Sequence, residues 1–183
     1  MRVFAGLSLT GKLREAIKKG WEEIDDRARA HLRPVIPENW HITLYFYGEI
    51  ENEMVARIYE AYDAVCPGLR AVRARLGAWG GFPSAENARV VWAGLKEGEE
   101  QIREIKRRLD EAHRLAGIPW DEKTFHPHIT VGRAKNRPVG IKVKDLPPES
   151  DILDTICVYR STLTPAGAVY ETLKEYKLET GGA

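Results

Sequence analysis

The chain has 183 residues, 28 Lys and Arg against 27 Asp and Glu, a net charge of +1 and a hydrophobic fraction of 43%. That fraction supports a packed core and excludes global disorder, while the balanced charge excludes a uniformly basic nucleic-acid binder. Cys66 and Cys157 are too few for a disulfide framework, which indicates a reducing compartment. No apolar run approaches the roughly 20 residues of a membrane span, and no signal-peptide pattern is visible. We therefore expect a cytoplasmic protein with no membrane segment.

The first half of the chain predicts two strands and two helices. Apolar segments predict strands over 3–9 and 40–48, and amphipathic segments predict helices over 11–30 and 51–65. The helix over 11–30 is indicated by apolar residues at helical spacing, namely Leu13, Ile17, Trp21 and Ile24.

The chain from residue 70 onward predicts one further helix and several further strands. The helix is expected over 97–116, and Gly117 is its stop signal. Alternating segments rich in β-branched or aromatic residues predict strands over 70–79, 151–162 and 168–179. Two further strands are expected over 90–95 and 125–133. Segment 80–88 predicts a turn, and 134–149 predicts an irregular basic stretch.

Two short sequences recur at nearly the same offset. VFAGL at 3–7 is matched by VWAGL at 91–95, and HIT at 41–43 is matched by HIT at 128–130. Two matches at offsets of 88 and 87 residues indicate an internal repeat, approximately 3–48 and 90–133. We expect residues 1–183 to form a single bilobal domain in which a pseudo-two-fold axis relates the lobes.

The order of the elements leaves two fold classes open. Interleaved strands and helices suit a parallel doubly wound sheet. However, the turn at 164–167 suits an antiparallel hairpin between the last two strands. We favour an α+β fold, with a mostly antiparallel sheet and flanking helices in each lobe and a groove between the lobes.

Alternation along the HIT strands predicts which side chains share a face. In 40–48, one face would carry Trp40, Ile42, Leu44 and Phe46, and the other would carry His41, Thr43, Tyr45 and Tyr47. In the second strand, His126, His128 and Thr130 would share a face. The repeat would then bring two pairs of imidazole and hydroxyl groups to one groove.

Two opposed histidines suit metal-free acid–base chemistry. One imidazole can accept a proton from the attacking nucleophile while the other donates one to the leaving group. The Thr43 and Thr130 hydroxyls can hydrogen-bond phosphate oxygens, so displacement at a phosphodiester is the reaction that fits. The alternative is that the repeat preserves packing and the histidines are surface residues. A packing repeat would favour keeping apolar positions rather than polar ones.

HITLYFYG and HPHITVGR resemble the paired HxTx motifs of the 2H phosphoesterase superfamily, and more specifically the RNA 2′,3′-cyclic phosphodiesterases that are also called 2′–5′ RNA ligases. MRVFAGLSL, GGFPSAENARVVWAGL and STLTPAGAVYETL extend the resemblance over nearly the whole chain. It implies a bilobal fold and hydrolysis of an RNA 2′,3′-cyclic phosphate to a 2′-phosphate. We expect no metal, no cofactor, an RNA partner for which tRNA is one source, and a monomer.

The resemblance also assigns residues. His41 matches the family's proton donor to the departing 3′ oxygen, and His128 matches the proton acceptor that activates water. Thr43 and Thr130 match the hydroxyls that contact phosphate, and Arg133 matches a basic residue that follows the second motif. The sequence departs from the family at Tyr45, Tyr47 and Val131, which puts the preferences of the groove wall in doubt.

Other aromatic and histidine residues have competing interpretations. Tyr45, Tyr47 and Phe82 are candidates for stacking on bases. We expect Trp40, Phe46 and Trp92 to be core, and His31 and His113 to be surface residues. Trp21 and Trp120 are expected in the core or an interface. His126 and His128 invite a metal site, but no acidic partner lies at ligand spacing.

Basic residues are concentrated in three segments, which leaves the rest of the chain acidic. These are 133–144, 27–37 and the run Arg70, Arg73 and Arg75. We expect 133–144 at the groove mouth, where it would contact phosphates. The absence of a glycine-rich phosphate loop argues against an ATP-dependent ligase. Two alternatives remain open: a cyclic phosphodiesterase acting on a small nucleotide, and a module that binds RNA or nucleotide without catalysis. Reverse 2′–5′ ligation would be a side activity.

Overall fold

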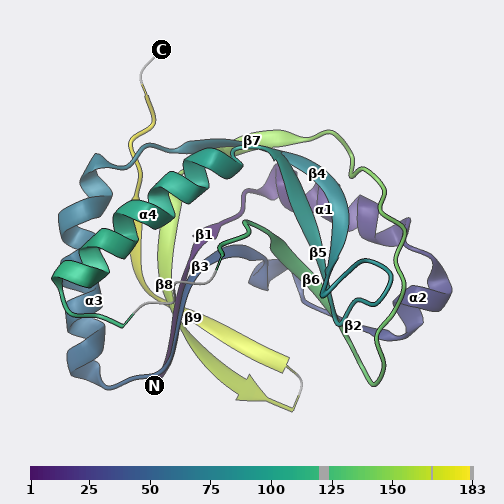
Figure 1. Cartoon of the computed structure of the whole chain (residues 1–183), viewed down its shortest axis with the longest axis horizontal. Helices are drawn as coiled ribbons and strands as arrows, with labels where there is room; N and C mark the ends of the chain where they lie inside the picture. The colour runs from purple at the N-terminus through teal and green to yellow at the C-terminus, as the bar shows by residue number, and fades with distance from the viewer. Residues whose placement is uncertain (120–123, 166, 182–183) are drawn as a thin grey trace.

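The computed structural model describes residues 1–119, 124–165 and 167–181. Its strands are β1 (Arg2–Ser8), β2 (Leu32–Pro34), β3 (His41–Glu49), β4 (Val72–Phe82), β5 (Val90–Glu97), β6 (Ile129–Ala134), β7 (Ser150–Leu153), β8 (Thr155–Thr164) and β9 (Gly167–Lys177). They form one nine-stranded sheet in the order β7-β4-β5-β6-β3-β1-β8-β9, with β2 paired to β6 (Figure 1). Every pairing between these named strands is antiparallel, which confirms the α+β fold and excludes the doubly wound alternative.

The strand order is symmetric about its centre. β5 and β6 on one side correspond to β1 and β3 on the other, and these strands carry the recurring sequences. The two halves join through the pairing of β3 with β6, whose register contains the single pair Ile42–Ile129. The two expected sheets are therefore hydrogen-bonded into one, and the residues of both HIT motifs flank the junction.

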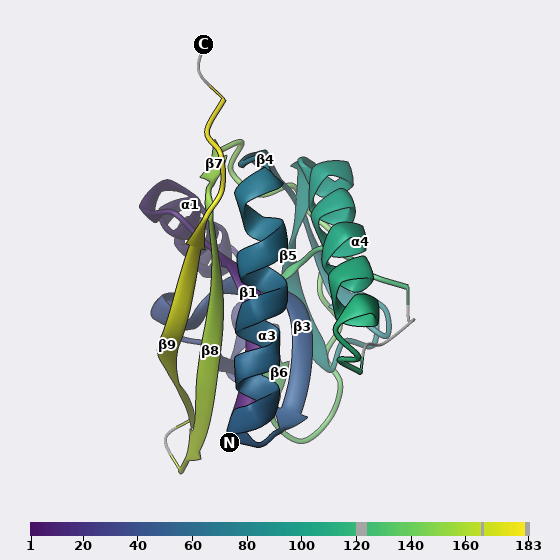
Figure 2. The same cartoon turned by 90° about the vertical axis from the view of Figure 1, so that its left-hand side faces the viewer.

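The helices lie at opposite ends of the molecule. α1 (Gly11–Glu22) and α2 (Asp26–Ala30) lie at one end, while α3 (Asn52–Val65) and α4 (Glu99–Leu115) pack side by side at the other (Figures 1 and 2). Short 3₁₀ helices form at η1 (Pro37–Asn39) and η2 (Cys66–Gly68). Most predicted bounds agree with the structure to within a few residues.

Two predicted elements are broken in the structure, each beside an aspartate. The helix expected over 11–30 stops after Glu22 and restarts as α2, because the Asp25 carboxylate accepts hydrogen bonds from the backbone N–H groups of Arg27 and Ala28. The strand expected over 151–162 is divided at Asp154 into β7 and β8.

The core runs along the sheet under the helices. The apolar face of α4 buries Ile102, Ile105 and Leu109, and burial of each such side chain is worth about 1.5–3 kcal/mol. Trp40 is buried as expected, and Trp21 is half-buried against Gly132 of β6. Cys66 and Cys157 are both free and buried. Trp120 lies outside the described residues.

No helix in the described ranges combines the length and the apolar character that crossing a membrane requires.

Candidate active site

Both HIT motifs lie on one face of the sheet at the junction of β3 and β6. Ile42 and Ile129 are paired and fully buried, so their neighbours along each strand point to the opposite face. In an antiparallel register, this pair places Thr43 beside His128 and His41 beside Thr130. Each histidine therefore neighbours the threonine of the other motif.

The same backbone contact fixes both imidazole rings. Nδ1 of His41 lies 2.7 Å from the Asn39 carbonyl oxygen, and Nδ1 of His128 lies 2.7 Å from the His126 carbonyl oxygen. Because a carbonyl oxygen only accepts, Nδ1 carries the proton in each ring and Nε2 is left for chemistry. Nε2 of His41 lies 2.9 Å from Oγ1 of Thr43.

Burial lowers the pKa of both histidines. The pKa of His41 falls to about 4, chiefly by desolvation, against the opposing effect of the Asn39 carbonyl. Charges on His128 and Arg133 lower the His41 pKa further. The pKa of His128 is also lowered, first by burial and then by His126 and Arg133. In the free protein, His41 is therefore neutral at pH 7.

A bulge in β3 changes which of its side chains share a face, so the assignment predicted from simple alternation is wrong beyond the bulge. Gly6 of β1 pairs with Thr43, but the next residue toward the N-terminus, Ala5, pairs with Tyr45, so Leu44 is an extra residue. Alternation reverses at that point. Phe46, expected in the core, is instead 58% exposed and shares the face of His41, while Tyr45, expected beside His41, is buried on the other face.

β6 has the same irregularity after its own HIT sequence. Trp92 of β5 pairs with Thr130 and Val91 pairs with Gly132, so Val131 is the extra residue. Arg133 is thereby turned onto the face of Thr130, as its expected role requires.

Tyr45 and Tyr47 belong to a cluster around α4. The Tyr45 ring stacks on His113 with 4.1 Å between centroids, and the Tyr47 hydroxyl lies 2.7 Å from Nε2 of His113 and 3.0 Å from the Tyr62 hydroxyl. His113, expected at the surface, is fully buried, because Tyr47 and the Leu109 carbonyl satisfy both ring nitrogens. His31 is exposed as expected.

Aromatic rings flank both histidines in a symmetric way. Phe4 and Trp92, the second residues of VFAGL and VWAGL, have ring centroids 4.7 Å from His41 and 6.1 Å from His128. Trp92, expected in the core, is half-buried at this position. Phe82 makes an edge-to-face contact with His128 at 4.9 Å, which places this predicted residue at the site.

Two cavities border the paired motifs. One, of about 570 Å³, is lined by His128, Thr43, Phe46 and Phe82, and both Tyr45 and Tyr47 reach its wall. The other, of about 400 Å³, is lined by His41 together with Asn39, Tyr159 and Tyr170. The hydrogen bond between His41 and Thr43 connects a residue that lines the second cavity to one that lines the first.

The predicted basic segments do not all reach this site. In 133–144, Arg133 acts on both histidines electrostatically, but Arg137, Lys142 and Lys144 line a different cavity that contains neither histidine. The expectation that the whole segment lies at the groove mouth is therefore wrong, because the chain turns away after β6. The Arg73 and Arg75 side of β4 is separated from β6 by β5.

His126 and His128 lie just before the start of β6, where the His126 carbonyl oxygen accepts a hydrogen bond from the His128 ring. Their rings stack with centroids 6.2 Å apart, and the His126 backbone orients the His128 ring. Among the described residues, no group of three or more His, Cys, Asp or Glu side chains is arranged to hold a metal ion.

Sequence reasoning missed Phe46 and Phe4 as residues of this face. A signal for both was present in the repeat. Phe46 stands at the same position of its motif as Arg133, and Phe4 at the same position as Trp92, so each had a counterpart at the site.

Comparison with known proteins gives a consistent result. The family model described as LigT like Phosphoesterase matches residues 8–92 and 94–170. The chain is 32% identical to an RNA 2′,3′-cyclic phosphodiesterase of Aeropyrum pernix, over 82% of this chain and 89% of that protein. It is also 32% identical to one of Archaeoglobus fulgidus, over 97% and 100%. A crystal structure of a Thermus thermophilus protein superposes with a TM-score of 0.86 at 27% identity and full coverage of both chains.

Proposed function

Because the chain belongs to the LigT-like phosphoesterase family, we propose that it hydrolyses RNA 2′,3′-cyclic phosphate ends to 2′-phosphates, with His41 and His128 as general acid and base. One observation carries the assignment of the two histidines. Each holds its Nδ1 proton on a backbone carbonyl, so both present Nε2 on the face where Thr43 and Thr130 also lie. Two relatives named for this reaction supply the substrate class.

The reaction needs one proton acceptor and one donor. Neutral Nε2 of His128 takes a proton from water while the water oxygen forms a bond to phosphorus. The bond from phosphorus to the 3′ oxygen breaks, and protonated Nε2 of His41 gives its proton to that oxygen. The product has a 2′-phosphate and a 3′-hydroxyl, and proton exchange with solvent restores both histidines. Thr43 and Thr130 donate hydrogen bonds to the non-bridging phosphate oxygens.

The low pKa of His41 in the free protein is compatible with its role as acid. An anionic phosphate beside the ring stabilises the imidazolium and raises the His41 pKa when substrate binds. Substrate therefore helps to charge its own proton donor. Arg133, on the same face, supplies the second positive charge for the phosphate.

The cavity wall provides for the rest of the substrate. Phe82 and the exposed ring of Phe46 border the cavity beside His128, where a base would lie. The two imidazoles supply acid and base themselves, so we propose that hydrolysis requires no metal. By microscopic reversibility the same groups would join the cyclic end to a 5′-hydroxyl as a side activity. We further propose that the protein acts as a cytoplasmic monomer and that tRNA is one source of its substrate.

The test is incubation of an RNA oligonucleotide ending in a 2′,3′-cyclic phosphate in excess EDTA, with the product isomer assigned by ³¹P NMR. The wild type is expected to yield the 2′-phosphate. His41→Ala and His128→Ala should each lose about 10²–10⁴-fold in kcat, and the double variant should be little worse because the pair acts as a unit. Thr130→Val should also be slower, while Thr162→Val, an exposed strand position, is the matched control.

Three outcomes would contradict the proposal. Unchanged cyclic phosphate with folded wild type excludes the hydrolysis. Restoration of activity by Mg²⁺ or Zn²⁺ excludes metal independence. Cleavage of a cyclic mononucleotide or of ADP-ribose 1″,2″-cyclic phosphate, but not of the oligonucleotide, transfers the activity to a small nucleotide.

A further inference from the structure

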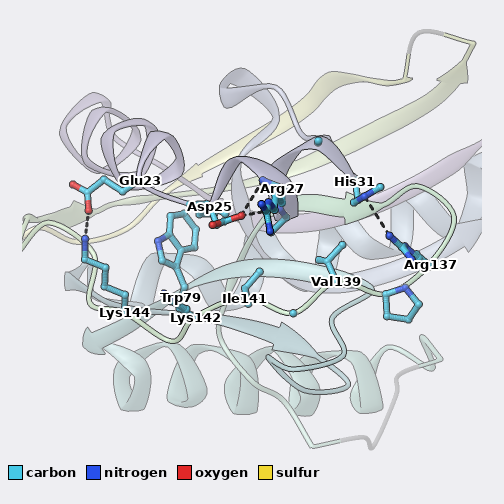
Figure 3. Close-up of a pocket in the computed structure, with 15 residues that line it drawn as sticks. Glu23, Asp25, Arg27, His31, Trp79, Arg137, Val139, Ile141, Lys142 and Lys144 are labelled. Atoms are coloured by element: carbon cyan, nitrogen blue, oxygen red, sulfur yellow. Dashed lines mark hydrogen bonds and ion pairs between the residues drawn. The ribbon is translucent and has the colours of Figure 1, made fainter.

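A cavity of about 900 Å³, lined by neither motif histidine, lies between α2 and residues 137–144 (Figure 3). We call it the α2 pocket. Polar and basic side chains line it from two sides: Arg27 and His31 from the α2 segment, and Arg137 and Lys142 from the facing segment. Val139 and Ile141 add an apolar surface between them. The mechanism proposed above uses none of these residues.

The charges of the α2 pocket are not balanced within it. Its two carboxylates are engaged: Glu23 pairs with Lys144 at 2.5 Å, and Asp25 caps α2 through the backbone N–H of Arg27 at 2.9 Å. Arg27, Arg137 and Lys142 are exposed and have no carboxylate partner among the described residues. Instead, Nη2 of Arg137 lies 3.5 Å from Nε2 of the His31 ring. The pocket thus presents three cations to an incoming anion.

The α2 pocket is linked to the paired motifs by a line of basic residues. Arg133 shares the face of Thr130 and is paired across β2 and β6 with Arg33. The chain then continues through Lys135, whose Nζ donates to the Ala30 carbonyl oxygen at 2.9 Å, to Arg137. Since an extended chain spans at most about 3.6 Å per residue, the four residues from Arg133 to Arg137 cover no more than about 14 Å. A single flexible strand of nucleic acid can bridge that separation.

We propose that the α2 pocket binds an internal nucleotide of the RNA substrate while the cyclic end of the same strand lies at His41 and His128. The phosphodiester contacts Arg27, Arg137 and Lys142, and the base lies against Val139 and Ile141. This inference takes its ligand, a single-stranded RNA, from the function proposed above. Basic side chains next to an apolar surface are the combination by which proteins hold single strands without reading their sequence.

The first experiment measures binding and does not depend on hydrolysis. A fluorescent single-stranded RNA of about 12 nucleotides with a 3′-phosphate end is titrated with the full chain, and anisotropy gives the Kd. Arg27→Ala/Arg137→Ala is compared with Arg57→Ala/Arg70→Ala, which removes two other exposed arginines outside the pocket. We expect the pocket variant to bind at least about fivefold more weakly and the control variant to change less than about twofold. The slope of log Kd against log salt should be shallower in the pocket variant, by about 0.7 for each phosphate that the protein no longer neutralises.

The second experiment separates long from short substrates. With the same RNA ending in a 2′,3′-cyclic phosphate, the pocket variant should lose at least about fivefold in kcat/KM through KM. With a cyclic-phosphate dinucleotide, which has no internal nucleotide to place in the α2 pocket, it should match the wild type.

The outcomes distinguish this proposal from the one on which it rests. Equal binding by both double variants, or an equal loss on dinucleotide and long RNA, overturns the pocket assignment. Intact cyclic phosphate with selectively weakened binding overturns the hydrolysis and keeps the pocket. A free mononucleotide that displaces the RNA only from wild type and control would instead assign the pocket to a small phosphate ligand, which also overturns the proposal.

Discussion

Phe46 and Arg133 occupy equivalent positions in the two repeats, each five residues after the histidine of its HIT motif. In both strands an extra residue after the motif threonine reverses the alternation. The bulge turns Phe46 onto the face of His41 and turns Arg133 onto the face of Thr130. One backbone irregularity, used twice, thus places an exposed aromatic ring on one side of the site and a positive charge on the other.

Replacing Phe46 with alanine should weaken substrate binding without unfolding the protein. Phe46 is exposed and lines the cavity that His128 borders, so its ring is available to stack on a base. Stacking of one base on an aromatic side chain is worth about 1–3 kcal/mol, so KM should rise about 5- to 150-fold while kcat changes little. Steady-state kinetics on a cyclic-phosphate RNA measure this.

Leu115→Ala is the matched control for Phe46. Leu115 is 73% exposed and borders the groove between α3 and α4, so its removal should leave both parameters unchanged. If Phe46→Ala left KM at the wild-type value, the ring would have no part in substrate binding.

The pH dependence of kcat/KM should be displaced toward acid. This parameter follows the free enzyme, in which burial lowers the pKa of His41 to about 4 and also lowers that of His128. The fraction of molecules with one protonated and one neutral histidine is largest between those two values, hence below pH 6.5. The kcat profile follows the complex, in which the phosphate raises the His41 pKa, so its maximum should lie at higher pH. Coincident maxima in the two profiles would refute this electrostatic account.

Gly6→Ala should displace His41. A Cβ at Gly6 would lie 2.8 Å from the Ile42 carbonyl oxygen and 3.0 Å from Cδ2 of His41, closer than ordinary contacts allow. Because a misplaced general acid transfers its proton poorly, kcat should fall at least about tenfold with a smaller change in KM. Gly11→Ala, where no neighbouring atom lies within 4 Å of the added Cβ, should retain wild-type kinetics. Equal rates for the two variants would show that the strand accommodates the methyl group.

His113 should make the fold sensitive to acid. Burial lowers the pKa of His113 to about 4, below the ordinary value of 6.5 that applies when the chain unfolds. As pH falls from 6.5 toward 4, the unfolded state binds a proton that the folded state does not, so the free energy of unfolding falls. The contribution is at most about 3 kcal/mol and vanishes above pH 6.5.

Urea unfolding of wild type and His113→Gln at pH 4.5 and 7.5 measures this effect. Gln can keep one hydrogen bond of the Tyr47 and Leu109 pair but does not titrate, so the variant should lose less stability between the two pH values. His41 and His128 change the free energy of unfolding with pH by the same amount in both proteins, so their effect cancels in the comparison. An identical loss in both proteins would show that His113 takes no part in the acid response.

The sequence predicted the paired motifs because their chemistry is written in residue identity and spacing. Recurrence of HIT and of VFAGL with VWAGL located both histidines and both threonines, and the hairpin near the C-terminus indicated the antiparallel sheet. These inferences depend only on which residues repeat, and local sequence carries that information.

Tertiary structure decided where individual side chains point and what the basic segments border. Alternation assigned Tyr45 to the site and Phe46 to the core, and a bulge reversed both, because an extra residue in a strand depends on pairing with its neighbour rather than on residue type. His113 is buried because the Tyr47 hydroxyl and the Leu109 carbonyl oxygen form hydrogen bonds with its two ring nitrogens. The net charge of +1 did not predict that the cations at 137–144 would face Arg27 across a cavity. These segments are distant in sequence, and only folding brings them together.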